Sequence, residues 1–508
     1  MKIQRTKNAT RNIVFGVLYR IVATLCPFIM RTVLLYKLGV DYLGLNNLFT
    51  SLLSFLSLAE LGVGSAMVYA MYKPIAEEDN ATVCALLNLY KQLYRIIGTI
   101  ILVIGLCLLP FINHLVKGEH PANINLYILY LIYLVNTVVS YYLFGYKQSI
   151  LMAHQRNDII SKTSMIVQMM MYICQVLLLV LFANYYYYII MLPIFTVVTN
   201  FANSYLVDKY YPQFTCKGTV DCETSKQIKK NVLALIGGKL SNTVLHSSDN
   251  LVLSAFLGLS AVAIYGNYYY ILNAIVGFTE VIYTALTAGI GNSIVTEEIE
   301  KNHKDFRILS FMNAWLVAWC TTSYMCLVQP FMKIWTGESL MFPISMVILF
   351  SVYFYLYQIN KIVLAYKDAA GLWWHDRFRP YVVMGTNLIS NIILVQVIGI
   401  HGVILSTIVS LIISVPWATY TIYKFLFKKG AVQYARRFTV NALIAFMACF
   451  CTFKICSLIN INKYMDLILR GVVCCIVPNL IILVLNFRNP DLIESKNKVM
   501  WILKRGKR

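Results

Sequence analysis

Among the charged side chains inside segments that are otherwise apolar enough to lie in a membrane, six could carry chemistry. They are Arg20, Arg31, Glu60, Lys239, Asp249 and Glu280. A charge at the centre of a bilayer costs about 2.5–3.5 kcal/mol on insertion scales, so these side chains are expected to face a protein interior or a water-filled cavity. The planar fork of an arginine binds phosphate oxygens in pairs, and a carboxylate that is desolvated binds a proton more readily. The residues therefore indicate a path for an anionic substrate, with gradient coupling through the acids.

The charges share helix faces with other polar side chains. Arg20 and Arg31 lie on one face with Thr24 and Pro27, which places the two guanidinium groups about 16 Å apart along the helix axis. A corresponding stripe in the second half of the chain consists of Lys239, Asn242, His246 and Asp249. Two further stripes consist of Asn46, Thr50, Ser57 and Glu60, and of Asn273, Gly277, Glu280, Thr284 and Thr287. We expect the stripes to face each other between two halves of the protein.

From these stripes we predict five substrate-binding residues and three cavity or coupling acids. The former are Arg20, Arg31, Lys239, Asn242 and His246, and the latter are Glu60, Asp249 and Glu280. The alternative is structural: Arg31 with Glu60, or Lys239 with Asp249, would form neutralising pairs that only hold helices together. Glu60 follows two arginines and is expected to stay ionised in a salt bridge. Glu280 is expected to lack a dedicated cation, which would make it the better proton-coupling site.

The composition indicates the class of protein that positions these residues. Of its 508 residues, 59% are hydrophobic and 13% are charged, and the mean hydropathy is +0.67, which excludes an ordinary soluble domain. We predict an all-α polytopic membrane protein with about 14 transmembrane helices. They are 12–38, 44–72, 86–113, 123–151, 159–183, 185–207, 231–257, 261–291, 306–332, 341–366, 381–400, 402–427, 439–459 and 467–487. No cleavable signal peptide is expected before the first of them.

The basic residues predict the topology. The odd-numbered connections and their flanks hold only five of the 43 Lys and Arg residues, namely Lys37, Lys117, Lys333, Lys454 and Lys463. By the positive-inside rule both termini are then cytoplasmic. The net charge of +21 reflects this topology and attraction to the membrane surface, and no nucleic acid is expected as a partner.

The sequence contains an internal duplication. Leu257-Gly258 repeats an earlier Leu-Gly pair, and the 13-residue interval from Asn47 to Glu60 recurs from Asn267 to Glu280. This predicts two six-helix bundles with the same orientation. The predicted domains are an N-terminal bundle (1–210), a cytoplasmic linker (211–230), a C-terminal bundle (231–430), two extra transmembrane helices (431–487) and a basic cytoplasmic tail (488–508).

Other motifs are not expected to carry chemistry. The 13 cysteines show no CxxC spacing, so apolar packing is favoured over metal binding or disulfides. Gly238-Lys239 is followed by Leu240, where a phosphate-binding loop needs Ser or Thr. No cofactor or metal is therefore expected, and ATP is not expected as direct fuel.

The chain closely resembles the bacterial polysaccharide-biosynthesis flippases, which translocate O-antigen and capsule repeat units. They belong to the multidrug/oligosaccharidyl-lipid/polysaccharide exporter superfamily. The resemblance runs from about Arg5 to Phe487 and rests on the segments RTVLLYKLGVDYLGLNNLF, AELGVGSA, YKPIAEED, SSDNLVLSAFLG, YGNYYYI and AGIGN. It implies two six-helix bundles plus two C-terminal helices, and alternating access that moves an undecaprenyl-diphosphate-linked oligosaccharide from the cytoplasmic to the outer leaflet. It further implies a bacterial inner (plasma) membrane location, contact with membrane lipids, proton or sodium coupling, and a polysaccharide polymerase and assembly proteins as partners.

Three alternatives remain at this stage. A flippase for lipid II or another cell-wall precursor would use the same mechanism. A drug or cation antiporter of the same superfamily would need an excess of acids in the cavity, whereas here three cations balance three acids. A membrane enzyme would need a sizeable outer loop or a soluble catalytic domain, and the longest outer connections are only His114–Ala122 and Lys333–Leu340. We therefore do not expect an enzyme.

Overall fold

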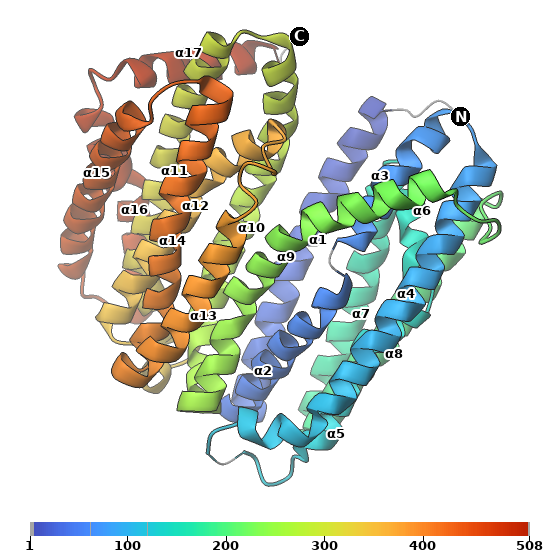
Figure 1. Cartoon of the computed structure of the whole chain (residues 1–508). Coiled ribbons are helices and arrows are strands. Elements are labelled where there is room, and N and C mark those ends of the chain that lie inside the picture. The colour runs from blue at the N-terminus through green and yellow to red at the C-terminus, as the bar shows by residue number, and fades with distance from the viewer. Residues whose placement is uncertain (1–4, 61, 119, 506–508) are drawn as a thin grey trace. The chain divides into compact units, whose positions relative to one another are not determined.

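The structure, a computed structural model, describes residues 5–505 except 61 and 119 (Figure 1). A few side chains within this range, that of His246 among them, also lie outside the description. The described residues form helices joined by short connections, and no strand occurs among them. This confirms the prediction of an all-α membrane protein.

The number of membrane spans is close to the predicted fourteen. Within the described part of the chain, 11 helices are long and apolar enough to cross a membrane, or up to 12 if one bent pair (Leu126–Tyr142 and Gly145–Ala153) is a single span. Two predicted spans are not among them. Segment 44–72 is broken into helices that are each too short, and segment 231–257 lies in a helix that carries the polar stripe and several charges. The two predicted spans that are not among these long apolar helices are thus two of those predicted to line the site.

The chain divides into two compact units, the first ending at Gly266 and the second beginning at Asn267. In the first unit α1 packs along α7, α7 along α8, and α2 along α9 (Figure 1). The α2 residues Leu43, Leu45 and Phe49 are fully buried in its core. The helices of this unit are α1 (Arg5–Lys37), α2 (Val40–Leu56), α3 (Val63–Ala76), α4 (Asn80–Leu108), α5 (Leu126–Tyr142), α6 (Gln148–Ala153), α7 (Asn157–Phe182), α8 (Tyr185–Tyr210) and α9 (Cys222–Leu257), with the 3-10 turns η1 (Ser57–Glu60), η2 (Leu109–Leu115) and η3 (Gly145–Lys147).

In the second unit α11 is central, because α12, α15 and α16 all pack against it. α13 and α14 form a closely packed hairpin, and α14 also packs on α12. The first turns of α10 belong to the first unit and the remainder to the second. The helices are α10 (Leu259–Thr296), α11 (Ile299–Trp335), α12 (Ile344–Ala369), α13 (Arg379–Ile398), α14 (Ile400–Ile422), α15 (Val432–Ser457), α16 (Lys463–Leu485) and α17 (Pro490–Arg505), with the 3-10 turn η4 (Glu338–Leu340) and the π-helical turn η5 (Tyr423–Phe427).

Repeat-related glycines separate the helices that carry the polar stripes. Gly39, between α1 and α2, has φ 108° and ψ 179°, and Gly258, between α9 and α10, has φ 88° and ψ 178°. Residues with a side chain rarely adopt this backbone conformation. The two helical segments that follow these glycines differ. The segment after Gly39 is broken between α2 and α3, where Gly62 has φ 86°. The segment after Gly258 continues as the single helix α10. The predicted single span 44–72 is therefore two helices that meet next to Glu60.

Candidate functional site

Arg31 lies where α1, α2 and the start of α10 meet. Its Nη1 atom donates a hydrogen bond of 3.0 Å to Oδ1 of Asn47, which is only 9% exposed. The Asn47 amide in turn donates to the carbonyl of Val262 at 3.4 Å. A Cβ atom placed on Gly266 would lie 2.3 Å from Asn47 Nδ2 and 3.2 Å from Arg31 Nη2. Asn47 therefore orients the guanidinium group, and only a glycine at 266 leaves room for the pair.

The Gly266→Ala substitution is expected to displace the Asn47 amide from Arg31. An extra methyl group in a packed interior typically costs about 1–3 kcal/mol, so the midpoint of thermal unfolding should fall. The matched control is Gly289→Ala in the same helix, where a Cβ meets nothing within 4 Å. Thermal unfolding of both purified variants measures the effect. Equal midpoints for the two would show that the close approach at Gly266 is not tight.

Glu60 is surrounded by tyrosines. Tyr94 donates to Oε1 of Glu60 at 3.2 Å, and Tyr141 donates to Oε2 at 3.1 Å. Tyr90 continues the chain by donating to the Tyr94 hydroxyl at 2.9 Å. In the described residues Glu60 makes no ion pair, so the predicted salt bridge to an arginine is wrong. Tyrosine hydroxyls satisfy the carboxylate instead, and they would still be able to do so if it bound a proton.

Asp249 is also held by a tyrosine. It is 4% exposed, and its Oδ2 accepts a hydrogen bond of 2.5 Å from Tyr265, near the start of α10. The next residue on α9, Asn250, donates to the Ser51 hydroxyl of α2 at 2.8 Å. On the opposite side of α2, Asn46 accepts from Tyr133 of α5 at 2.5 Å. Polar side chains thus follow α2 and α9 through the interior of the first unit.

The other predicted substrate-binding residues lie on α1 and α9. Arg20 is half-buried on α1, where its backbone carbonyl accepts from the Thr24 hydroxyl at 2.9 Å. Lys239 and Asn242 are exposed on α9. The side chain of His246 lies outside the described part of the chain. The structure therefore brings Arg31 together with Asn47 and leaves the roles of the other four as predictions.

Glu280, in the second unit, has a dedicated cation. Lys361 of α12 lies 2.8 Å from its carboxylate, with side chains 18% and 49% exposed respectively. The expectation that Glu280 lacks a cation is therefore wrong. Lys361 was not predicted as a partner of Glu280, although a lysine inside the predicted span 341–366 was a visible signal. Its register relative to Glu280 could not be obtained from either segment alone.

Lys361 continues a row of tyrosines. Its ammonium group lies 4.8 Å from the centre of the Tyr357 ring, which stacks on Tyr353 at 5.8 Å. The hydroxyl of Tyr269 lies 3.5 Å from that of Tyr353. By contrast Tyr268 is fully buried and donates to Gln329, so it belongs to the packing core. Stacked aromatic faces beside a charged pair suit a sugar ring.

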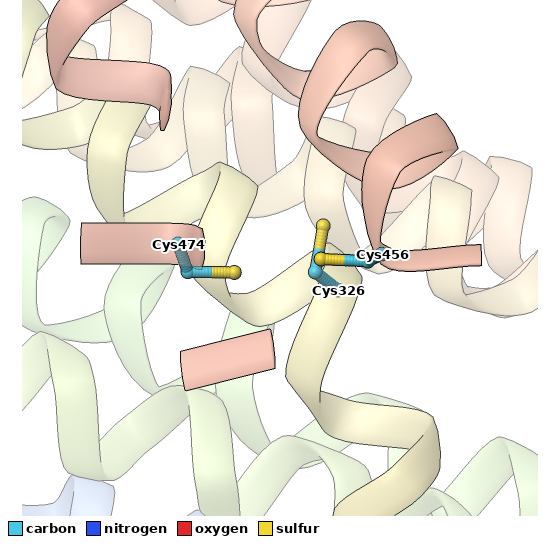
Figure 2. A group of neighbouring side chains, drawn as sticks. All are labelled: Cys326, Cys456 and Cys474. Carbon is cyan, nitrogen blue, oxygen red and sulfur yellow. The ribbon is translucent and has the colours of Figure 1, made fainter. Parts of the chain in front are cut away.

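Three cysteines of the second unit converge in its interior. Figure 2 shows Cys326 of α11, Cys456 of α15 and Cys474 of α16 with their sulfur atoms directed toward one another. All three sulfur atoms lie within 4.8 Å of each other, and the residues are only 1–2% exposed. Soft cations favour thiolates, but a structural zinc site needs a fourth ligand, and no described His, Asp or Glu joins the group. The surroundings are apolar, so the predicted packing role stays the simplest interpretation.

Outside the membrane-spanning segments, two carboxylates act at the ends of helices. Hydrogen bonds from Thr82 lower the pKa of Asp79, and hydrogen bonds from Thr224 lower the pKa of Asp221. Each caps the helix that follows it, α4 and α9 respectively. Burial against Tyr211, whose ring lies 4.3 Å away, lowers the pKa of His154. These groups fix connections and take no part in the buried network.

Comparisons with known proteins agree with this arrangement. The family model described as polysaccharide biosynthesis protein matches residues 9–287, which is more than half of the chain. No curated protein matches the sequence. Among solved structures, the lipid II flippase MurJ in an inward closed conformation is 16% identical, with a TM-score of 0.64, and the match covers 95% of this chain and 99% of that one.

Two transporters share the fold as well. An inward-facing multidrug resistance MATE family transporter of the MOP superfamily is 16% identical, with a TM-score of 0.60, covering 79% of this chain and 94% of its own. A MOP superfamily transporter from Pyrococcus furiosus, described as having a binding pocket of reverse polarity, is 15% identical, with a TM-score of 0.53 and coverage of 84% and 97%. The resemblance noted from the sequence is thus confirmed, and the chain belongs to the polysaccharide biosynthesis protein family, with the fold of the flippases and transporters of the MOP superfamily.

Proposed function

We propose that this protein is a flippase that moves undecaprenyl-diphosphate-linked oligosaccharide repeat units from the cytoplasmic to the outer leaflet of a bacterial plasma membrane. It would serve the synthesis of a surface polysaccharide such as O-antigen or capsule, and would work by alternating access. The observation that carries the proposal is the oriented Arg31–Asn47 pair in the interior of a chain of the polysaccharide biosynthesis family. Because Asn47 holds one nitrogen of the Arg31 guanidinium group, the remaining N–H donors can bind two diphosphate oxygens at once. A lysine ammonium group, which is a point charge, cannot make this paired contact.

The glycan and the diphosphate need different surroundings. The buried amides and hydroxyls along α2 and α9 offer hydrogen bonds in the first unit, and the row of Tyr269, Tyr353 and Tyr357 offers ring faces in the second. Arg20, Lys239, Asn242 and His246 are proposed to extend the binding surface. A cell-wall precursor is the second candidate substrate, because the fold of the lipid II flippase matches 95% of the chain.

Proton coupling is proposed to act through Glu60. When Glu60 takes up a proton no ion pair is broken, because among the described residues its partners are the hydroxyls of Tyr94 and Tyr141. When Glu280 takes up a proton, Lys361 loses its counter-ion while its side chain is 18% exposed, which is costly. This reverses the roles expected from the sequence. Asp249, held by Tyr265, is proposed as a further cavity acid.

Complementation tests the proposal. In a strain that lacks its own repeat-unit flippase, expression of this chain should restore surface polysaccharide, whereas the Arg31→Ala variant at equal membrane level should not. The cell-wall alternative predicts instead that the chain rescues a strain depleted of its lipid II flippase. Rescue of that strain alone would contradict the repeat-unit assignment, and rescue of neither would contradict a flippase function altogether.

The distribution of basic residues predicts both termini in the cytoplasm. In a variant depleted of other cysteines, a single cysteine introduced at Lys217, in the connection before α9, should react with a membrane-impermeant maleimide only after the cells are opened. A cysteine introduced at Lys117, in the connection before α5, should react in intact cells. The opposite labelling pattern would contradict the orientation.

A further inference from the structure

A cavity of about 410 Å³ opens where α11, α15 and the start of α17 meet in the second unit. We name it the C-terminal basic pocket. Its polar lining includes Arg307 and Ser310 of α11, Gln433, Arg436 and Arg437 of α15, and Asp491 of α17. The predicted substrate-binding residues and cavity acids do not line it.

The charges of the pocket do not cancel. Arg307 lies 2.6 Å from the buried carboxylate of Asp491, and Arg437 lies 3.9 Å from its other oxygen. Arg436 is exposed and, in the described part of the chain, makes no ion pair. Three guanidinium groups and one carboxylate thus line the pocket, which leaves two positive charges without an acidic counterpart in its lining. Such a pocket attracts an anion.

A neutral donor also points to an anion. The Ser310 hydroxyl oxygen is buried and has no hydrogen-bond partner among the described residues. A buried hydroxyl without a partner costs free energy, and a bound phosphate oxygen would remove that cost. The Gln433 amide adds a further donor on the neighbouring helix. Guanidinium, hydroxyl and amide donors together are the set that recognises a phosphodiester.

One side of the pocket is apolar. Phe311, Ala314, Phe438 and Val440 line it, and from Val440 a row of exposed apolar side chains continues along α15. This row consists of Val440, Leu443, Met447 and Phe450, at the spacing of one helix face. A free phosphate would make no contact with this apolar surface, whereas the acyl chain of a lipid would cover it.

The helix that closes the pocket fits a membrane surface. The sequence of α17, PDLIESKNKVMWILKR, contains the apolar run VMWIL, a tryptophan and four basic residues beside two acidic ones. Amphipathic basic helices with a tryptophan lie in the interface between headgroups and acyl chains. A helix of this composition is suited to the membrane interface, which would place the pocket near lipid phosphates.

We propose that the C-terminal basic pocket binds the headgroup of an anionic phospholipid, with its phosphate on Arg436, Arg437 and Ser310 and an acyl chain along the α15 row. The lipid would join α17 to α11 and α15. None of the proposed substrate-binding residues or cavity acids lines the site, so the phosphatidylglycerol test does not depend on the proposed function.

Native mass spectrometry of the purified full chain in detergent, titrated with phosphatidylglycerol or phosphatidylcholine, tests the site. We expect phosphatidylglycerol to bind at least about tenfold more tightly than phosphatidylcholine, and the Arg436→Gln/Arg437→Gln variant to lose this preference. The control Arg488→Gln/Lys496→Gln removes two charges near the same helix, neither of which lines the pocket, and should keep it. Because Arg437 also pairs with Asp491, Arg436→Gln alone is included, and it should weaken binding without changing the unfolding midpoint of the lipid-free protein.

Four results would overturn the proposal. One is equal binding of the two lipids by the unmodified protein. Another is an equal loss of preference in the control variant, which would indicate general surface charge. The third is displacement of phosphatidylglycerol by glycerol phosphate at equal concentration, which would indicate a simple anion site. The fourth is stronger binding of undecaprenyl phosphate than of phosphatidylglycerol, which would assign the pocket to the lipid of the proposed substrate.

Discussion

Transport is expected to fall by about a hundredfold or more when Arg31 is replaced by alanine, because two charge-assisted hydrogen bonds of about 1.5–3 kcal/mol each are lost. Arg31→Lys keeps the charge but not the fork, so its transport rate should lie between those of the unmodified protein and Arg31→Ala. Asn47→Ala should also lower the rate, since Asn47 orients the guanidinium group at 3.0 Å. The measurement is the initial rate of lipid-linked oligosaccharide translocation in proteoliposomes.

Arg95→Ala is the matched control for this series. Arg95 is an arginine of the same unit, exposed on α4, and outside the Arg31–Asn47 contact. Its substitution should leave the rate within about twofold of the unmodified protein. The assignment of Arg31 would be wrong if Arg31→Ala and Arg95→Ala transported at the same rate with equal amounts of protein in the vesicles.

Glu60→Gln is expected to abolish the stimulation of transport by a proton gradient. The amide cannot bind the proton, yet it has the size of the carboxylate and can still bond to Tyr94 and Tyr141. Glu280→Gln is the comparison, since that carboxylate is paired with Lys361 and is not expected to exchange protons during transport. The ratio of transport rates with and without an imposed pH gradient measures the effect. It should fall to about one in Glu60→Gln and stay at the unmodified value in Glu280→Gln.

Two further results bear on that prediction. Tyr94→Phe keeps the carboxylate and removes one donor, so transport should become slower but should still respond to the gradient. If Glu60→Gln responded to the gradient as the unmodified protein does, coupling would not pass through Glu60. If only Glu280→Gln lost the response, the assignment based on the sequence would be restored.

Patterns of hydrophobicity and charge were enough to predict the fold class. Long apolar segments can only be buried as helices in a membrane, and the alternation of basic residues is a property of the sequence itself. The Leu-Gly repeat correctly indicated equivalent backbone positions, since Gly39 and Gly258 have nearly the same conformation. The broken segment at Ser57–Gly62 was not foreseen, although Gly62 and Gly64 so close to a buried acid were a signal of irregular backbone.

The partners of the charged residues were the part that the sequence could not supply. Placing a charge on a helix face needs only the helical period, which serves for Arg31 and Glu280 but not for Glu60, because Glu60 lies in the 3-10 turn η1. Pairing needs the rotation and height of neighbouring helices, which depend on packing throughout each unit. The rule that a buried charge seeks its opposite led to an expected arginine at Glu60, whereas three tyrosines of α4 and α5 surround it. How the two units together form the translocation path, and the division into bundles at 210 and 231, stay predictions.

The most direct test of the proposed flippase is translocation by the purified protein alone. Undecaprenyl-diphosphate-linked oligosaccharide would be incorporated into proteoliposomes, and a membrane-impermeant glycosidase added outside would cleave every glycan that it reaches. The proposal predicts that the protected inner-leaflet fraction is cleaved over time with the unmodified protein and stays protected with Arg31→Ala. Protection that persists with the unmodified protein as it does in protein-free vesicles would contradict the proposed function.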